Sequence, residues 1–194
     1  MVIEDRELHF TTEAPLRGWR LFRVREDDVG VLLSSPMYHD PTPPSWPLAV
    51  STATCYKGHP APAAGCRCGI YAAIPGTLDS LPGYLRDTAH DRDPWAYAEV
   101  ACSGRVFVDL RGVRAERAEV VRIALAEQGW RSAAALEEAK RALVMRYGVP
   151  VGGAAEVPNW VRGNLRSEGP PPDDAALDLD TLNLHMSQER RRGS

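Results

Sequence analysis

The chain contains the segments Cys55-Tyr56-Lys57-Gly58-His59 and Cys66-Arg67-Cys68-Gly69, which together carry three thiols and one imidazole. The spacing of these groups is Cys-x3-His-x6-Cys-x-Cys. Structural zinc sites hold the ion in a tetrahedron of four such ligands, and three cysteines with one histidine form a standard closed set. The sequence therefore predicts a structural Zn²⁺ site whose ligands are Cys55, His59, Cys66 and Cys68.

The segment between the ligands favours a sharply bent loop, because it is rich in glycine and proline. Cys66 and Cys68 are two residues apart, so in extended chain both side chains point to one face. Apolar runs at residues 47–54 and 70–74 flank the ligands and are typical of strands. We therefore expect a metal-clipped loop over residues 55–68 that joins two strands.

Other interpretations of the cysteines stay open at this point. They can be ordinary buried thiols beside a surface histidine, a Cys66–Cys68 or Cys55–Cys66 disulfide, or an iron–sulfur or redox thiol site. A catalytic zinc is disfavoured because all four positions are filled and none remains for water. A nucleoside-deaminase site is excluded because it needs His-x-Glu before Pro-Cys-x-x-Cys.

Composition indicates an ordinary globular chain. Of 194 residues, 44% are apolar and 25% are charged, which favours a single domain with a tail. The net charge of −3 gives no general attraction to nucleic acid or to anionic membranes. We find no signal peptide and no apolar run long enough to cross a membrane. With four cysteines, three of them in the loop, we expect a cytoplasmic protein in which Cys102 is a buried thiol.

Alternating patterns predict strands in the first 110 residues. Residues 7–11 and 18–25 read as strands, and in the second we expect Trp19 and Leu21 to face one way, and Arg20 and Phe22 the other. A turn at 26–28 leads to a partner strand at 29–34. We expect the Pro-rich connection 35–47 to pack against the sheet, and a short helix near 80–90. Residues 95–102 and 105–110 predict a hairpin with Ser103-Gly104 at its tip.

After residue 112 the apolar spacing becomes helical, which predicts helices over 113–129 and from the cap Ser132 to Gly148. The expected fold class is α+β: a small antiparallel β-sheet or partly open barrel with a zinc-clipped loop, two C-terminal helices and a flexible tail. We assign residues 1–151 to one domain and 152–194 to a Pro/Gly/Asp-rich, largely disordered tail. Leucines between aspartates at 177–184 suggest a segment that can dock a partner.

The motif with its neighbours at residues 18–20, 99–106 and 114–116 resembles a group of bacterial proteins, common in actinobacteria. The string Cys-x-Cys-Gly-Ile-Tyr-Ala carries most of this resemblance, which covers residues 18–120. The chain departs from the group at Cys102, where other members often have an aromatic residue, and near Asp109, where they have a histidine. The resemblance supports a metal site and implies no reaction.

These observations favour a non-enzymatic, zinc-stabilised binding or adaptor module with a protein partner, since no acid, base and nucleophile are grouped in the sequence. Nucleic-acid binding is an alternative, through the helices of 113–147 or the Arg-rich strand 17–25. Glu137 and Glu138 oppose it, because they open the second helix with charges that repel phosphates. A thiol-based redox or metal sensor is the third hypothesis. For the arginines of 17–25 we favour a solvated strand face over a phosphate-binding strip.

Overall fold

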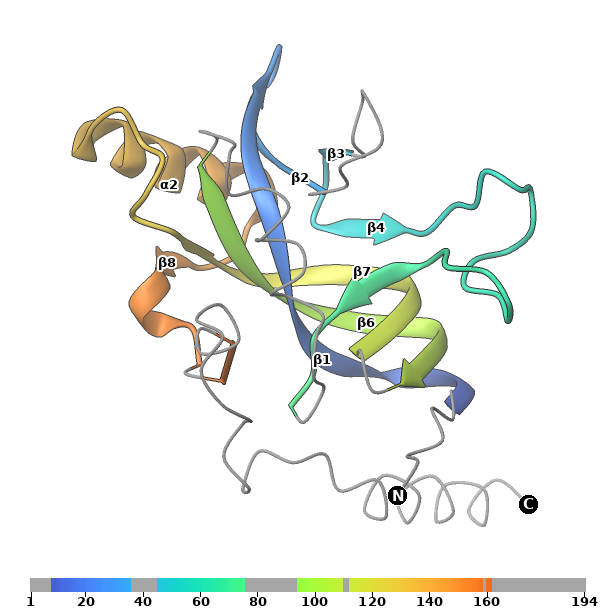
Figure 1. Ribbon diagram of the computed structural model, residues 1–194. Coiled ribbons are helices and arrows are strands. Elements are labelled where there is room, and N and C mark those ends of the chain that lie inside the picture. The colour runs from blue at the N-terminus through green and yellow to red at the C-terminus, as the bar shows by residue number, and fades with distance from the viewer. Residues whose placement is uncertain (1–7, 36–44, 76–93, 110–111, 159, 162–194) are drawn as a thin grey trace.

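The computed structural model describes residues 8–35, 45–75, 94–109, 112–158 and 160–161 (Figure 1). Within these residues the chain forms one eight-stranded sheet, one α-helix and one short 3₁₀ helix. The elements are β1 (Leu8–Asp27), β2 (Gly30–Ser34), β3 (Ser45–Trp46), β4 (Val50–Thr52), β5 (Ile70–Ala72), β6 (Trp95–Asp109), β7 (Gly112–Leu125), α2 (Ala133–Tyr147), β8 (Val151–Gly153) and η1 (Ala154–Glu156).

The sheet is open and mostly antiparallel, with the strand order β3-β2-β1-β6-β7-β4. Strand β7 pairs with β6 along one edge, and along its other edge with β5, β4 and β8 in succession. The β7–β8 ladder is parallel, so the prediction of a purely antiparallel sheet is wrong at this one place. Beyond β5, Trp19 and Ala73 exchange two backbone hydrogen bonds of 2.7 Å, which tie the exit of the metal loop to β1.

The predicted hairpin over residues 95–110 is wrong, because β6 continues without a reversal past Ser103-Gly104. The register passes from Ser103 opposite Arg117 to Val106 opposite Ala115, so β6 carries one extra residue there. Gly104 has a φ of 76°, which is a left-handed conformation that suits a bulge as well as a turn. The glycine thus bends a continuous strand and does not reverse it. Residues 8–27 likewise form one strand where two were predicted.

The helix predicted over 113–129 is also wrong, since residues 112–125 form β7. Val120 lies opposite Val100, whereas Arg122 lies opposite Glu99, so Val121 is an extra residue in β7. This bulge and the one in β6 interrupt the alternation of inward and outward side chains. The apolar residues are therefore spaced three and four apart, as in a helix. The hypothesis of nucleic-acid binding through two helices of 113–147 therefore loses its first helix.

The second predicted helix is confirmed as α2. The Oγ atom of Ser132 accepts a hydrogen bond from the backbone N–H of Ala135, and Gly148 ends the helix with a φ of 67°. Tyr147 anchors α2 to the sheet, because its hydroxyl accepts from the Leu33 N–H at 2.8 Å and donates to the Trp46 carbonyl at 2.5 Å. Trp46 is buried and belongs to β3, which pairs with β2, whereas residues 36–44 of the predicted connection lie outside the described residues.

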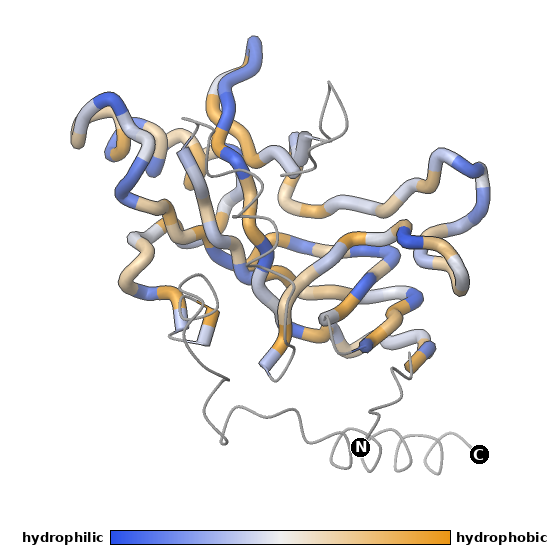
Figure 2. Tube along the Cα trace, in the orientation of Figure 1, coloured by the Kyte–Doolittle hydropathy of each residue, from blue (hydrophilic) through white to orange (hydrophobic). Residues whose placement is uncertain are grey.

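Apolar clusters cover both faces of the sheet, and hydrophobic and hydrophilic residues alternate along the central strands (Figure 2). In β1, Phe22 belongs to the cluster under α2, whereas Trp19 and Leu21 belong to the opposite one, so the predicted alternation is confirmed. Val157 and Val161 are buried in the second cluster.

The packed domain therefore continues past the predicted boundary at residue 151, because β8 crosses that boundary and residues up to 161 contribute to the core. The rest of the expected tail, including 177–184, lies outside the described residues. So does the helix expected near 80–90.

Candidate metal centre

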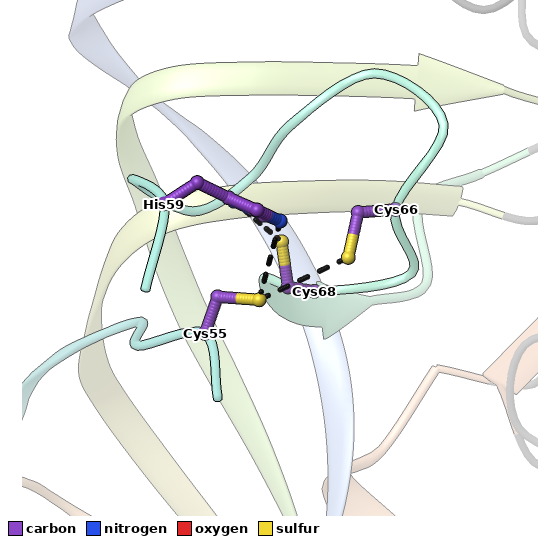
Figure 3. A group of neighbouring side chains, drawn as sticks. All are labelled: Cys55, His59, Cys66 and Cys68. Atoms are coloured by element: carbon purple, nitrogen blue, oxygen red, sulfur yellow. Dashed lines mark hydrogen bonds between the residues drawn. The ribbon is translucent and has the colours of Figure 1, made fainter. Parts of the chain in front are cut away.

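The four predicted ligands lie together between β4 and β5 (Figure 3). Cys55 follows β4, His59 lies in the bend beyond it, and Cys66 and Cys68 precede β5. One ligand atom from each residue lies within 4.8 Å of all the others, and the four side chains are half-buried. They can hold a single metal ion, and all four cysteines of the chain are free of disulfides.

The separations between the ligand atoms agree with a tetrahedron around one ion. The Cys55 Sγ atom lies 3.9 Å from the Cys66 Sγ atom and 3.3 Å from the His59 Nε2 atom. Zinc bond lengths imply tetrahedral edges of about 3.8 Å between two sulfurs and about 3.5 Å between sulfur and nitrogen. These two separations therefore fit a common tetrahedral centre, while the Cys68 Sγ atom lies 4.0 Å from the Nδ1 atom of His59.

The ring of His59 is oriented by the backbone of the next residue, Pro60. Its Nδ1 atom lies 3.1 Å from the carbonyl oxygen of Pro60 and donates a hydrogen bond to it. This assignment of the proton follows from the acceptor, since a carbonyl cannot donate. The Nε2 atom then carries the lone pair and faces the thiol of Cys55. Histidine ligands of metals are commonly fixed by such a hydrogen bond to the other ring nitrogen.

The backbone of the loop is bent at its glycines, as the sequence predicts. Gly58 donates its N–H to the carbonyl of Cys55 at 2.9 Å, which closes a turn between the first two ligands. Gly69 follows the last ligand with a φ of 125°, and a Cβ atom there would lie 3.3 Å from the Cβ of Arg114. A side chain at this position would be strained and crowded.

Arg114 of β7 holds the loop through hydrogen bonds from its side chain. One of its guanidinium nitrogens donates to the carbonyl oxygen of Cys66 and, at 3.4 Å, to that of Cys68. The guanidinium lies over the ring of Phe107, 5.0 Å from its centroid, and is largely buried. It thus fixes the backbone of two ligands.

Sequence analysis does not single out Arg114, because the cations nearest to the ligands along the chain are Lys57 and Arg67. In the structure the ammonium group of Lys57 lies over the ring of its neighbour Tyr56. Arg114 comes near the ligands only because β5 and β7 pair, with Tyr71 opposite Arg114. The one local indication that Arg114 has a structural role is its position between the apolar residues Val113 and Ala115.

A second contact joins the outer part of the loop to the sheet. Arg105 of β6 donates to the carbonyl oxygen of Ala61 at 3.2 Å and forms an ion pair of 3.2 Å with Glu116 of β7. The backbone carbonyl of Glu116 accepts from the N–H of Ala53, just before the first ligand. The loop is therefore attached at its beginning, its middle and its end.

The thiols of the cluster titrate unequally. A hydrogen bond from the Cys68 backbone lowers the pKa of the Cys66 thiol to about 7. Burial, and to a smaller extent the neighbouring Cys66, raises the pKa of the Cys68 thiol to about 11. Without a cation the cluster thus favours a mixture of thiol and thiolate. A bound divalent ion favours three thiolates, so binding releases protons.

The remaining candidates of the sequence analysis lie apart from this cluster. Cys102 is fully buried, as predicted, and burial raises the pKa of its thiol to about 12. Among the arginines of 17–25, Arg17 is exposed, whereas Arg20 and Arg23 make contacts within the chain. Arg20 donates to the carbonyl of Tyr71 and to the hydroxyl of Ser35, and Arg23 is buried with its guanidinium over Trp95.

Comparisons with known proteins return no match: no family model, no curated protein and no solved structure resembles the chain significantly. Among the described residues, no helix is long and apolar enough to cross a membrane. The same residues contain one group of histidine, cysteine or acidic side chains that can hold a metal, which is the group described above. The site is therefore interpreted from its own geometry.

Proposed function

We propose that the protein is a non-enzymatic binding or adaptor module whose central loop is stabilised by Zn²⁺ and whose partner is another protein. One observation carries this proposal: three sulfurs and one imidazole nitrogen lie within 4.8 Å of one another, which makes a complete tetrahedral set. Structural zinc sites are closed in this way, whereas catalytic ones keep a position for water.

Zinc is proposed over other ions because of the chemistry of the ligands. Thiolates with imidazole in a tetrahedron suit zinc, whereas magnesium and calcium prefer oxygen. The ring nitrogen held by the Pro60 carbonyl and the carbonyls held by Arg114 supply the outer support that such sites commonly have. Three thiolates on one zinc leave a net negative charge, which Arg114 offsets.

Substitution of Co²⁺ for Zn²⁺ tests whether the site is closed. A four-coordinate site of three sulfurs and one nitrogen should give the intense visible bands of tetrahedral cobalt. Addition of azide or cyanide should leave these bands unchanged, because no coordination position is open to them. A band shift on addition of a small anion contradicts a purely structural site and favours a catalytic one.

A second candidate function, a thiol-based redox or metal sensor, is supported by the distance of 3.9 Å between the Cys55 and Cys66 sulfurs. Two thiols this close can form a disulfide when a peroxide accepts their two electrons, and the ion would then lose two ligands. Stoichiometric metal release by dilute peroxide, reversed by a dithiol, favours this function. Retention of metal under the same conditions favours the structural role.

The resemblance to the actinobacterial group and a cytoplasmic location belong to the same proposal. The free cysteines support a reducing compartment. A nucleic-acid partner is not favoured, because residues 112–125 form β7 in place of the first of the two expected helices. In addition, Arg20 and Arg23 of β1 contact other residues of the chain.

A further inference from the structure

Among the described residues, strand β4 pairs with β7 on one side and with no strand on its other side. Val120 donates its N–H to the carbonyl of Ala49 at 2.8 Å, and Ala53 donates to the carbonyl of Glu116 at 2.7 Å. In an antiparallel ladder the direction of the backbone groups alternates from one residue to the next. Because Ala49 and Ala53 bond to β7, the alternate residues Val50 and Thr52 point their N–H and C=O groups away from β7. Over the described residues, neither of the two makes a backbone hydrogen bond on that outer side.

This outer side is short, at three residues, but it has no charge, proline or bulge to protect it. Natural edges are blocked by charged side chains, by proline or by a bulge. Residues 48–54 read Leu-Ala-Val-Ser-Thr-Ala-Thr and contain neither a charge nor a proline. Leu48, at the start of this run, is 67% exposed. The strand is short, but it is chemically open to another strand.

Two charges beside the strand favour a particular occupant. Val50 lies opposite Glu119 and Thr52 lies opposite Arg117 on β7, so each pair shares the outer face of the sheet. Glu119 and Arg117 are both exposed, and neither forms an ion pair in the described part of the chain. The strand next to the edge therefore carries a negative charge opposite Val50 and a positive charge opposite Thr52.

These charges match when the edge meets a second copy of itself. An antiparallel pairing with its two-fold axis at Ser51 places Val50 opposite Thr52 of the second copy. Glu119 then lies in one row with Arg117 of the second copy, across two small residues. Three strand spacings separate their Cα atoms by about 14 Å. Their long side chains shorten this gap to a distance at which opposite charges still attract at moderate salt.

We propose that the protein forms a two-fold symmetric dimer in which β4 of one copy pairs antiparallel with β4 of the other. The outward N–H and C=O groups of Val50 and Thr52 supply four hydrogen bonds, and the two rows of Glu119 and Arg117 fix the direction of pairing. Such an interface is isologous, as in most soluble dimers. The proposal goes beyond the proposed function and does not depend on which metal the loop binds.

Proline substitution on the outer side tests the hydrogen bonds directly. Thr52→Pro removes an N–H that points away from β7, so the ladder within one copy keeps its bonds. Sedimentation of the metal-loaded wild type should show a mass that doubles as concentration rises through the micromolar range. Thr52→Pro should remain a monomer at every concentration. The matched variant Thr52→Val keeps the N–H and should dimerise like the wild type.

Charge reversal tests the direction of pairing without touching the backbone. Glu119→Lys places like charges in both rows and should weaken the dimer about tenfold at low salt, from the usual size of exposed charge pairs. Arg117→Glu should have a similar effect. The double variant Glu119→Lys with Arg117→Glu restores opposite charges and should return the dissociation constant close to that of the wild type.

Three outcomes overturn the proposal. A wild-type protein that stays monomeric at the highest concentration leaves the edge to some other polypeptide. A dimer that survives Thr52→Pro, with native circular dichroism, uses another surface. A double charge variant as weak as the single ones shows that Glu119 and Arg117 do not face each other. None of these results would affect the metal stoichiometry, so failure of the dimer is distinguishable from failure of the zinc site.

Discussion

Arg114 illustrates how a single side chain can connect the sheet to the metal loop. Its guanidinium donates to the backbone carbonyls of the ligands Cys66 and Cys68 and lies over the ring of Phe107. Arg114→Met keeps much of the apolar stem and removes the donors. We expect metal affinity to fall by roughly tenfold to a hundredfold, as for other outer-shell partners. Competition with a chromophoric chelator measures this change.

Arg117→Met is the matched control for this prediction. Arg117 lies on the same strand, three residues away, and its side chain is exposed. Its replacement should leave metal affinity unchanged. Equal losses in both variants would show that the charge of β7 matters in general, and that the specific contacts of Arg114 do not.

Cys102 gives a prediction about pH. Burial raises the pKa of its thiol to about 12, whereas an exposed cysteine ionises near pH 8.5. Between pH 7 and pH 10 the folded protein should therefore keep Cys102 protonated and unreactive. Alkylation located by mass spectrometry should show no rise in labelling of Cys102 over this range. Labelling that rises and then levels off near pH 8.5 would mean that the thiol is accessible and has an ordinary pKa.

At the scale of elements, the contact between α2 and the sheet depends on one hydroxyl. Tyr147→Phe leaves the buried N–H of Leu33 and the carbonyl of Trp46 without their shared partner. We expect a loss of about 2 kcal/mol in the free energy of unfolding. Urea denaturation of the metal-loaded protein provides the measurement. Tyr56→Phe, at a side chain that is 93% exposed, should change stability by less than about 0.5 kcal/mol.

Strand β5 depends on a close approach at Gly112. This residue has a φ of 133°, and a Cβ atom would collide with the carbonyl oxygen of Ala72. Gly112→Ala should cost about 2 kcal/mol or more and should also weaken metal binding, because β5 leaves the loop at Cys68. Gly153→Ala serves as the control, since open space surrounds that glycine. A native-like melting temperature for Gly112→Ala would refute the argument.

The elements that could be predicted from sequence are those with local signals. The four ligands were identified from spacing, and α2 from the cap Ser132 and the terminal Gly148. The long strands were misjudged, because the bulges near Ser103 and Val121 imitate a turn and a helix. Arg114 was missed because its place beside the ligands follows from the pairing of β5 with β7. Pairing of this kind joins residues far apart in sequence.

At the scale of the whole molecule, β7 organises the fold. One of its edges continues into the main sheet through β6, and the other holds the strand before the loop, the strand after it and β8. The metal loop is thus an insertion between two short strands on a shared support. The loop has few large apolar groups of its own, so we expect it to depend on metal coordination for its shape.

Metal content measured together with folding tests the central claim most directly. The account predicts one zinc per chain in freshly purified protein. It also predicts that removal of the ion, by a strong chelator or by Cys66→Ser, abolishes the cooperative unfolding transition of the loop and of β4 and β5, as followed by hydrogen exchange. Protein that contains no metal and yet protects the amides of the loop as well as the wild type does would contradict the account.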